Sequence, residues 1–333
     1  MSQSLPTIVI TGATGGIGQC VAIELARQGA HLVLTARSKA RAEATLALIE
    51  AAASGTRVDV YYGDFADVAS VAALGREIAA SHARIDVLIN NAGIHAFKPR
   101  VTADGMSEMV AVNYLAPWLL TNILRDTLVR SAPSRIITVA SEASRQAAGV
   151  DPLAALIDTR PFTARGSSKI YGQTKLLEIM FSLQLAHQLE GTGVAVNCLC
   201  PGFNVTELGR ELWFAAPLER LLKWLGIGDP GRGASIIVRL AGDPDFAEMT
   251  GGYFSVNNAR PLTPVAPAGD LQAQQALWRA TAERVSACWR PSSRSARFPQ
   301  RRIVAQTARI ASPEASKFWQ DAIHGHGTTQ DLR

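Results

Sequence analysis

A strand that runs into a glycine-rich turn is the feature that most constrains this 333-residue chain. Residues 7–11 are apolar and β-branched, and residues 12–18 follow as Gly-Ala-Thr-Gly-Gly-Ile-Gly at the start of a helical pattern. Glycine lets the backbone approach a phosphate closely, and the helix that follows offers free N–H groups to an anion. The turn therefore predicts a dinucleotide site, with an ordinary tight turn as the alternative.

Six further apolar runs alternate with helical patterns as far as residue 256. We expect strands at residues 7–11, 31–35, 58–62, 86–90, 135–139, 194–200 and 253–256. Several of these runs are almost wholly apolar, as parallel strands buried on both faces should be. The alternation predicts an α/β fold, a Rossmann-like doubly wound parallel sheet of about seven strands with helices on both faces.

Two long connections and a basic tail depart from this alternation. Residues 142–169 and 203–233 are longer than ordinary loops, and we interpret both as lid segments, the second on its many large apolar residues. Residues 289–333 are rich in Arg, Ser and Pro, and they hold eight basic residues against three acidic ones. We expect one folded domain over residues 1–288 and a poorly ordered C-terminal extension over residues 289–333.

Charge and composition exclude several classes of protein. The tail accounts for the whole net charge of +5, so the body is neutral and does not suggest a nucleic-acid partner. Four scattered cysteines fit a reducing compartment, and the six histidines lack the spacing of a metal site. No apolar run approaches the roughly 20 residues that span a bilayer. We therefore expect a cytoplasmic protein with no metal and no transmembrane segment.

The segment Ala-Arg-Ser-Lys-Ala-Arg at residues 36–41 follows the second expected strand. In NAD-specific sites an acidic residue near this point binds the ribose 2′-hydroxyl, whereas an arginine accommodates the 2′-phosphate of NADP. Arg37 stands here without an acidic neighbour, so we expect NADP, with NADPH bound in preference to NADH. The alternative is a group of solvated charges that opens the next helix.

Tyr171 and Lys175 lie four residues apart in a strongly helical segment, which places both side chains on one helical face. A free tyrosine has a pKa of about 10, and a neighbouring ammonium group lowers that pKa by favouring the phenolate. The pair therefore suits acid–base chemistry at neutral pH. Pairs of this kind also occur by chance, so the motifs around it decide its meaning.

Several motifs accompany this pair in order along the chain. They are Gly12, Thr14, Gly16, Ile17 and Gly18 in the first turn; Asp64; Asn90, Ala92 and Gly93; Asn113; Ser141; Tyr171 and Lys175; and Pro201, Gly202 and Thr206. In these residues the sequence resembles the short-chain dehydrogenase/reductase family, and the resemblance covers roughly residues 5–260. It implies an oxidoreductase that uses a nicotinamide cofactor.

The resemblance also implies a role for each residue. Tyr171 would be the general acid or base, and Lys175 would hold the nicotinamide ribose and lower the pKa of Tyr171. Ser141 would hydrogen-bond the substrate oxygen, with Ser144 as an alternative, and Asn113 would anchor a water that links Lys175 to solvent. The remaining motif residues, with Arg37, Tyr171 and Lys175, would bind the cofactor.

The wide spacing between Ser141 and Tyr171 is similar to that of the retinol dehydrogenase-like branch of the family. Trp213, Phe214 and Trp224 would form an apolar wall beside the site, or alternatively a dimer interface. We expect a bulky apolar carbonyl or alcohol as substrate. A polyketide- or terpenoid-like secondary metabolite is preferred, because the segment after Pro201 resembles pathway reductases, and a retinoid or steroid is the alternative.

Two other function classes stay open. The same fold and cofactor serve isomerases and dehydratases, and a non-catalytic NADP-binding protein would keep the fold without the reaction. Many members of the family form homodimers or homotetramers, and the sequence does not choose between these states.

Overall fold

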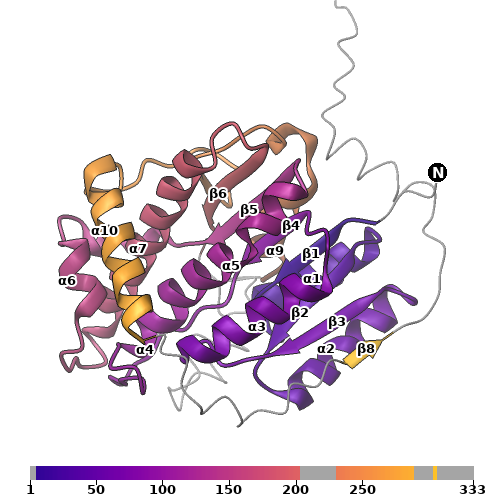
Figure 1. The fold of residues 1–333 in the computed structure, drawn as a ribbon, viewed down its shortest axis with the longest axis horizontal. Helices are drawn as coiled ribbons and strands as arrows, with labels where there is room; N and C mark the ends of the chain where they lie inside the picture. The colour runs from indigo at the N-terminus through magenta and orange to yellow at the C-terminus, as the bar shows by residue number, and fades with distance from the viewer. Residues whose placement is uncertain (1–4, 203–229, 289–302, 306–333) are drawn as a thin grey trace, which may run out of the picture.

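Parallel strands alternate with helices along the chain and form one sheet with helices on both faces (Figure 1). The computed structural model describes residues 5–202, 230–288 and 303–305. The strands are β1 (Thr7–Ile10), β2 (His31–Ala36), β3 (Val58–Tyr62), β4 (Val87–Asn90), β5 (Ser134–Val139), β6 (Val194–Cys200), β7 (Gly252–Ser255) and β8 (Ile303–Ala305). The predicted Rossmann-like α/β fold is confirmed, and β1 to β7 each begin and end within about one residue of the expected runs.

The helices fill the connections between the strands. They are α1 (Gly16–Arg27), α2 (Lys39–Ala52), α3 (Val68–Ser81), α4 (Glu108–Val110), α5 (Ala116–Arg130), α6 (Pro152–Ile157), α7 (Ser167–Gln188), α9 (Pro230–Gly242) and α10 (Leu271–Cys288). A π-helical turn at Ala111–Leu115 joins α4 to α5, and short 3₁₀ helices occupy Glu142–Ala147 and Pro244–Phe246. No described helix combines the length and apolar content that a membrane crossing needs.

The strand order makes β1 and β4 neighbours in the middle of the sheet. The order is β7-β6-β5-β4-β1-β2-β3-β8, and β1 to β7 are parallel. The chain builds one half of the sheet outward from β1, crosses back, and builds the other half from β4. Ligands of such sheets bind at the carboxyl ends of the strands where this reversal occurs. The turn after β1 and the loop after β4 therefore meet at the expected ligand site.

The edge strand β8 is a feature that the sequence pattern does not indicate. It pairs antiparallel with β3, with Val58 opposite Ala305 and Val60 opposite Ile303. The strand has three residues, and it lies inside a segment whose Arg, Ser and Pro content favours a poorly ordered extension. Composition averaged over a long segment hides a run this short. The pairing places part of residues 289–333 against the edge of the sheet.

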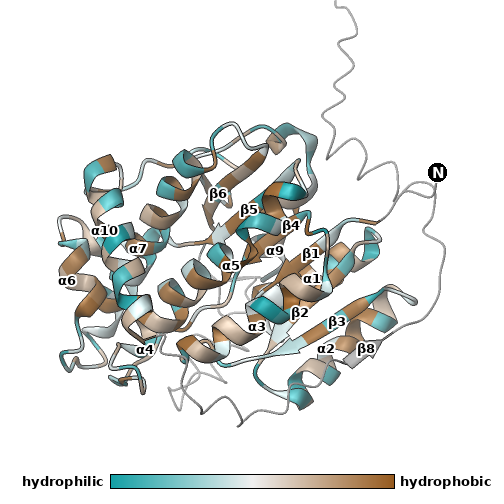
Figure 2. Cartoon of the chain, viewed as in Figure 1, coloured by the Kyte–Doolittle hydropathy of each residue, from teal (hydrophilic) through white to brown (hydrophobic). Residues whose placement is uncertain are grey.

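Two hydrophobic cores lie on opposite faces of the sheet. Figure 2 shows the strands as a largely hydrophobic layer between the helices. Side chains of α3, α5, α7 and α10 fill the core on one face, and side chains of α1, α2 and α9 fill the core on the other. Trp278 of α10 packs against Trp118 and Phe181, with ring centres 5.3 and 5.9 Å apart. Helix α10 thereby packs against the same core as α5 and α7.

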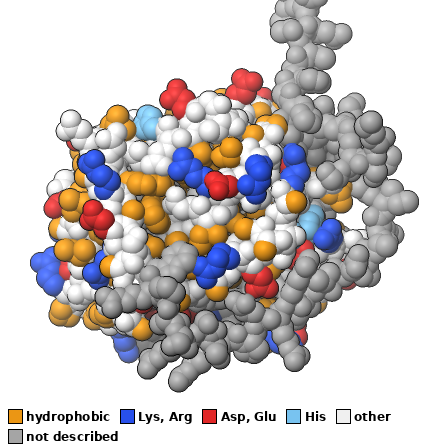
Figure 3. Space-filling view, viewed as in Figure 1, with side chains coloured by type: hydrophobic (Ala, Val, Ile, Leu, Met, Phe, Trp, Pro, Cys, Tyr) orange, Lys and Arg blue, Asp and Glu red, His pale blue; other side chains and the backbone are white. Residues whose placement is uncertain are grey.

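The surface of this body carries mixed charges. In the face that Figure 3 shows, Lys and Arg side chains alternate with Asp and Glu, and no large area carries one sign. The segment 142–169, which we expect to act as a lid, contains a 3₁₀ helix and α6 before α7 begins. Most of the other expected lid, residues 203–233, lies outside the described residues, and its last four residues begin α9.

Candidate active site

The glycine-rich turn after β1 is held against the loop after β4 by Asn91. Its side-chain Nδ2 donates to the carbonyl oxygens of Thr11, at 2.9 Å, and Gly12, at 3.3 Å. The Thr11 hydroxyl accepts from the backbone N–H groups of Asn91 and Ala92, both at 3.0 Å. A Cβ atom on Gly18 would overlap Asn91 Nδ2 and the Gly12 carbonyl oxygen. The turn therefore needs glycine at position 18 because its own backbone passes there.

The same turn leaves the start of α1 open to an anion. Gly12 has a positive φ of 68°, which favours glycine, and the N-cap residue Gly15 gives the helix no side-chain cap. The first N–H groups of a helix have no partner inside the helix and sit at the positive end of its dipole. The residues present thus fit the diphosphate group of a dinucleotide. Thr14, Gly16 and Ile17, named from the sequence, lie in this turn and the first turn of α1.

The carboxyl end of β2 brings a basic group to the outer side of the turn. Arg37 follows β2 directly and is exposed. Arg41 Nη2 donates to the Thr14 carbonyl oxygen at 2.9 Å, while the Ser38 hydroxyl caps α2 by accepting from the Arg41 N–H. Arg41 is thus engaged with the turn itself, whereas Arg37 at the strand end and Lys39 at the start of α2 are exposed to solvent.

Asn113 lies in the π-helical turn between α4 and α5 and is fully buried. Its Oδ1 accepts from the Ile94 N–H at 2.7 Å, and its Nδ2 donates to the Ile94 carbonyl and to Thr174 Oγ1, both at 2.9 Å. A π-helical turn widens the helix locally and is frequent at functional sites. Here it directs one side chain to both the loop after β4 and helix α7.

Tyr171, Lys175 and Ser141 meet beside this loop. Tyr171 and Lys175 lie one turn apart on α7, and the Lys175 Nζ is 5.5 Å from the centre of the Tyr171 ring. A side-chain hydrogen bond joins Tyr171 to Ser141, which follows β5. Gly93, in the loop after β4, lies against Asn113 and Lys175: a Cβ atom added to this glycine would be 3.5 Å from both Asn113 Oδ1 and Lys175 Nζ. The four residues that the sequence singles out for catalysis therefore form one cluster.

Ser141 rather than Ser144 faces the tyrosine. Ser141 also accepts from the Ala143 N–H at 3.1 Å and starts the 3₁₀ helix there. Ser144 is buried and lies beside Tyr253 of β7 instead. A Cβ atom on Gly172 would overlap the Ala143 carbonyl oxygen, so a glycine after Tyr171 lets α7 approach this 3₁₀ helix closely. The approach places the two hydroxyl groups together.

The electrostatics of the cluster differ in one respect from the expectation. Burial has the largest effect and raises the pKa of Tyr171. Lys175 and the Ser141 hydrogen bond lower this pKa, whereas Glu178 and Cys200 raise it. The net result is a pKa above the ordinary value for tyrosine. Lys175 acts in the expected direction, but desolvation of a phenolate at this position outweighs its effect. Tyr171 is therefore a protonated phenol at neutral pH in this structure.

Lys175 is held by two partners within the protein. Its Nζ donates to the Val139 carbonyl oxygen at the end of β5, at 2.9 Å, and lies 3.0 and 2.9 Å from the two carboxylate oxygens of Glu178. Burial alone would lower the pKa of Lys175, but Glu178 and Tyr171 reverse this and raise it. Burial raises the pKa of Glu178 to about 7, against the opposing effect of Lys175.

Aromatic side chains border the tyrosine on its other side. The His95 ring stacks on the Tyr171 ring with centres 4.7 Å apart, and on the Phe97 ring at 4.6 Å. His95 Nε2 also lies 3.1 Å from Ser167 Oγ, at the start of α7. The stack fixes the plane of the phenol ring, and His95 belongs to the site although the sequence motifs do not single it out.

Comparison with known proteins shows to which family the chain belongs. The family model for short chain dehydrogenase matches residues 6–152. Retinol dehydrogenase 14 of Mus musculus is 35% identical over 285 residues, which cover 82% of this chain and 83% of the relative. Retinol dehydrogenase 13 of Homo sapiens is 34% identical over 284 residues, covering 84% of each chain. The chain belongs to the short-chain dehydrogenase/reductase family. Its similarity places it in the retinol dehydrogenase-like branch.

A solved structure of this family carries the cofactor. The Pseudomonas aeruginosa RhlG/NADP active-site complex is 25% identical to this short-chain dehydrogenase, covers 76% of it, and matches with a TM-score of 0.58. The aligned region spans 95% of that chain. The shared fold supports a nicotinamide cofactor in this dehydrogenase, an oxidoreductase that acts on an alcohol or a carbonyl.

The other residues named from the sequence have different surroundings in the dehydrogenase. Asn90 is buried, and its Nδ2 donates to Thr121 Oγ1 of α5 at 3.0 Å, so it ties β4 to α5. Asp64 follows β3 and accepts from the Ala66 N–H at 3.0 Å. Pro201 and Gly202 follow β6, next to the site. Thr206 and the aromatic residues expected to form the apolar wall, Trp213, Phe214 and Trp224, lie outside the described residues.

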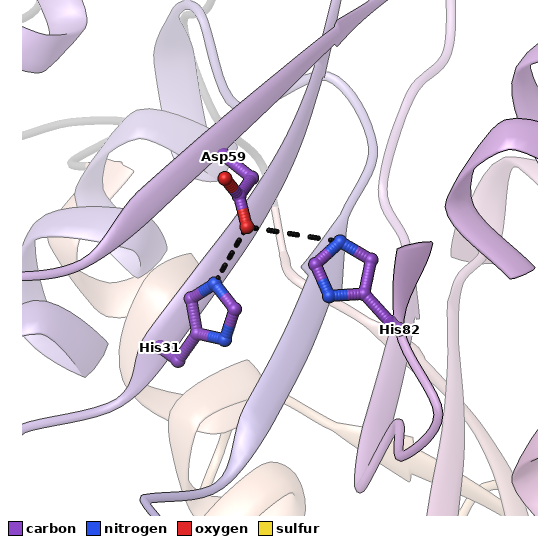
Figure 4. Close-up of side chains that lie close together, drawn as sticks. All are labelled: His31, Asp59 and His82. Carbon is purple, nitrogen blue, oxygen red and sulfur yellow. Dashed lines mark hydrogen bonds and ion pairs between the residues drawn. The ribbon is translucent and has the colours of Figure 1, made fainter. Parts of the chain in front are cut away.

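A second polar cluster lies at the opposite ends of the strands. Figure 4 shows His31 of β2 and His82, at the end of α3, turned toward Asp59 of β3. Asp59 Oδ2 is 2.9 Å from His31 Nε2 and 3.8 Å from His82 Nε2, and Tyr61 OH lies 2.9 Å from His82 Nε2. Residues of these types can ligate a metal ion. Hydrogen bonds within the cluster already account for its buried polar groups, so it is explained as a structural network of the dehydrogenase.

Proposed function

We propose that the protein is an NADP(H)-dependent oxidoreductase that interconverts a carbonyl and an alcohol on a bulky apolar substrate. The observation that carries the proposal is the cluster in which Tyr171 hydrogen-bonds Ser141 while Lys175 lies on the same helical face. When bound, the nicotinamide cofactor supplies or accepts the hydride. The residues of the chain then have to orient the substrate and move one proton.

The geometry gives each side chain a task in carbonyl reduction. Tyr171 OH donates its proton to the carbonyl oxygen as the alcohol forms, and the Ser141 hydroxyl stabilises the negative charge that develops on this oxygen. Lys175 attracts the phenolate that Tyr171 becomes, which lowers the free energy of the charged state. Tyr171 holds its proton at neutral pH, as the general acid of a carbonyl reduction must.

NADPH is the cofactor that the charges favour. Arg37 is exposed at the end of β2, where a 2′-phosphate would lie, and a charge-assisted hydrogen bond to it would stabilise NADPH by about 2 kcal/mol. We expect Arg37→Asp to reverse the preference for NADPH over NADH in a binding titration, because it removes this bond and adds repulsion. Equal affinities of the parent protein for both cofactors would refute the assignment. Arg279→Asp, at an exposed arginine of α10, is a control for charge.

The substrate class rests on the relatives and on the sequence. The names of the matched relatives favour an alcohol of the retinol kind. The apolar segment after Pro201 favours a polyketide- or terpenoid-like secondary metabolite. Both are bulky and apolar, and both would place one polar oxygen against Tyr171 and Ser141.

The test is a screen of cofactor oxidation and reduction by absorbance. NADPH would be offered with retinal, steroid ketones and aromatic polyketide ketones, and NADP⁺ with the corresponding alcohols. We expect NADPH oxidation with at least one of these carbonyl compounds. Tight NADPH binding with a chemical change of the substrate but no net oxidation of the cofactor would overturn the proposal in favour of an isomerase or a dehydratase.

A further inference from the structure

A buried carboxylate lies beside the Lys175 ammonium group, and the reaction proposed above gives it no task. Glu178 follows Lys175 by one turn of α7 and is 2% exposed. Its two oxygens lie 3.0 and 2.9 Å from Lys175 Nζ. Burial of a carboxylate costs free energy that only a close and well-oriented partner offsets. The ion pair is therefore an electrostatic feature of the site itself.

This ion pair competes with the tasks of Lys175. The ammonium group has three N–H donors, of which the Val139 carbonyl accepts one and Glu178 at least one more. A negative charge about 3 Å from Nζ also cancels much of the field that Lys175 exerts on Tyr171, whose ring centre is 5.5 Å from Nζ. Glu178 thus acts on the tyrosine through the lysine and through space.

We propose that Glu178 is a positioning residue that holds Lys175 against the end of β5 and offsets its charge, so that Tyr171 keeps its proton to a higher pH. The inference rests on the proposed function, because it requires Tyr171 to be the group that transfers the proton. It assigns to one acidic side chain the pH range in which the enzyme reduces carbonyl compounds.

The surroundings of the pair support this assignment. Glu178 raises the pKa of Tyr171, and the pKa of Glu178 itself, raised by burial to about 7, makes its charge change near neutral pH. The thiols of Cys198 and Cys200 face the cluster from β6, and Tyr253 faces it from β7. Burial raises the pKa values of Cys198 and Tyr253, so both groups are uncharged at neutral pH.

The test compares variants that change charge and shape separately. Glu178→Gln and Glu178→Met both remove the charge but differ in shape, Glu178→Asp keeps the charge, and Glu190→Gln removes an exposed carboxylate beyond the end of α7. The pH dependence of kcat/KM for carbonyl reduction would be measured for each. We expect both neutral variants to lose activity at a pH lower than the parent does, by about one to two units. The Asp and Glu190 variants should follow the parent.

A second measurement does not depend on turnover. Tyrosinate absorbance would be followed against pH in the parent and in Glu178→Gln, each compared with the same chain carrying Tyr171→Phe. The difference isolates the titration of Tyr171, and we expect it at lower pH in the Gln background. Tyr171→Phe with parental turnover would overturn the proposed function. An inactive Tyr171→Phe, together with unchanged profiles in the folded neutral variants, would overturn the role of Glu178 alone.

Discussion

Gly18 offers a sharp test of the cofactor turn, because its environment leaves no space for a side chain. A Cβ at this position would overlap the Gly12 carbonyl oxygen and Asn91 Nδ2, whereas ordinary contact begins at 3.4 Å. The Gly12 carbonyl belongs to a backbone segment with a positive φ, and the Asn91 side-chain amide is held by its hydrogen bond to the Thr11 carbonyl at 2.9 Å, so neither group can easily move away. In Gly18→Ala the turn, rather than a flexible side chain, has to move.

The expected size of the effect follows from these contacts. Overpacking costs about 1–3 kcal/mol, and replacing glycine by alanine inside a helix returns up to about 1 kcal/mol, so the free energy of unfolding falls by at most about 3 kcal/mol. Cofactor binding should suffer more. A shift of the turn breaks one or two charge-assisted hydrogen bonds to phosphate, each of about 1.5–3 kcal/mol, which corresponds to a loss in NADPH affinity of roughly 10- to 10,000-fold.

A fluorescence titration of NADPH, with circular dichroism to check the fold, measures both quantities. Gly75→Ala is the matched control, because Gly75 also lies within a helix but its Cβ would meet only the ends of the Ile123 and Leu120 side chains, at 3.1 Å. We expect the control to bind NADPH as the parent does. A folded Gly18→Ala protein with parental affinity would show that the cofactor phosphates do not bind at this turn.

Two further predictions concern buried charges. Asp59→Asn should lower the free energy of unfolding by about 1.5–3 kcal/mol, measured by urea denaturation, because it replaces the carboxylate in the buried hydrogen bond with His31; a loss below about 1 kcal/mol would contradict this. Glu178 has a folded-state pKa of about 7, above its ordinary value of 4.5, so the folded state binds an extra proton between these pH values. The free energy of unfolding of the parent should therefore fall by up to about 3 kcal/mol, relative to Glu178→Gln, as pH rises from 4.5 to 7; parallel stability profiles would contradict this.

The strands and the motif residues follow from the sequence because each depends on neighbours along the chain. Apolar runs and turn residues define the β-α alternation, and β1 to β7 match it closely. The close spacing of Tyr171 and Lys175 on one helix makes their juxtaposition predictable from helical geometry. Once the sheet order is known, Ser141 after β5 and Gly93 after β4 fall beside them.

The remaining features depend on contacts between distant segments. Asn90 and Asn91 are neighbours in the sequence, yet Asn91 holds the glycine-rich turn while Asn90 hydrogen-bonds Thr121 of α5. Their different roles follow from the direction that the chain takes after β4. Burial decides the direction of the Tyr171 pKa shift, and burial is a property of the whole fold. His31 and His82 stand 51 positions apart in the sequence, and the sheet and α3 bring both to Asp59.

The Tyr171→Phe variant tests the central claim most directly. Phenylalanine keeps the ring that stacks on His95 and removes only the hydroxyl that would transfer the proton. With the carbonyl substrate that the screen identifies, we predict that the variant binds NADPH as the parent does and that its turnover falls by about 10²- to 10⁴-fold. Turnover close to that of the parent, with the cofactor bound normally, would contradict the account of the site.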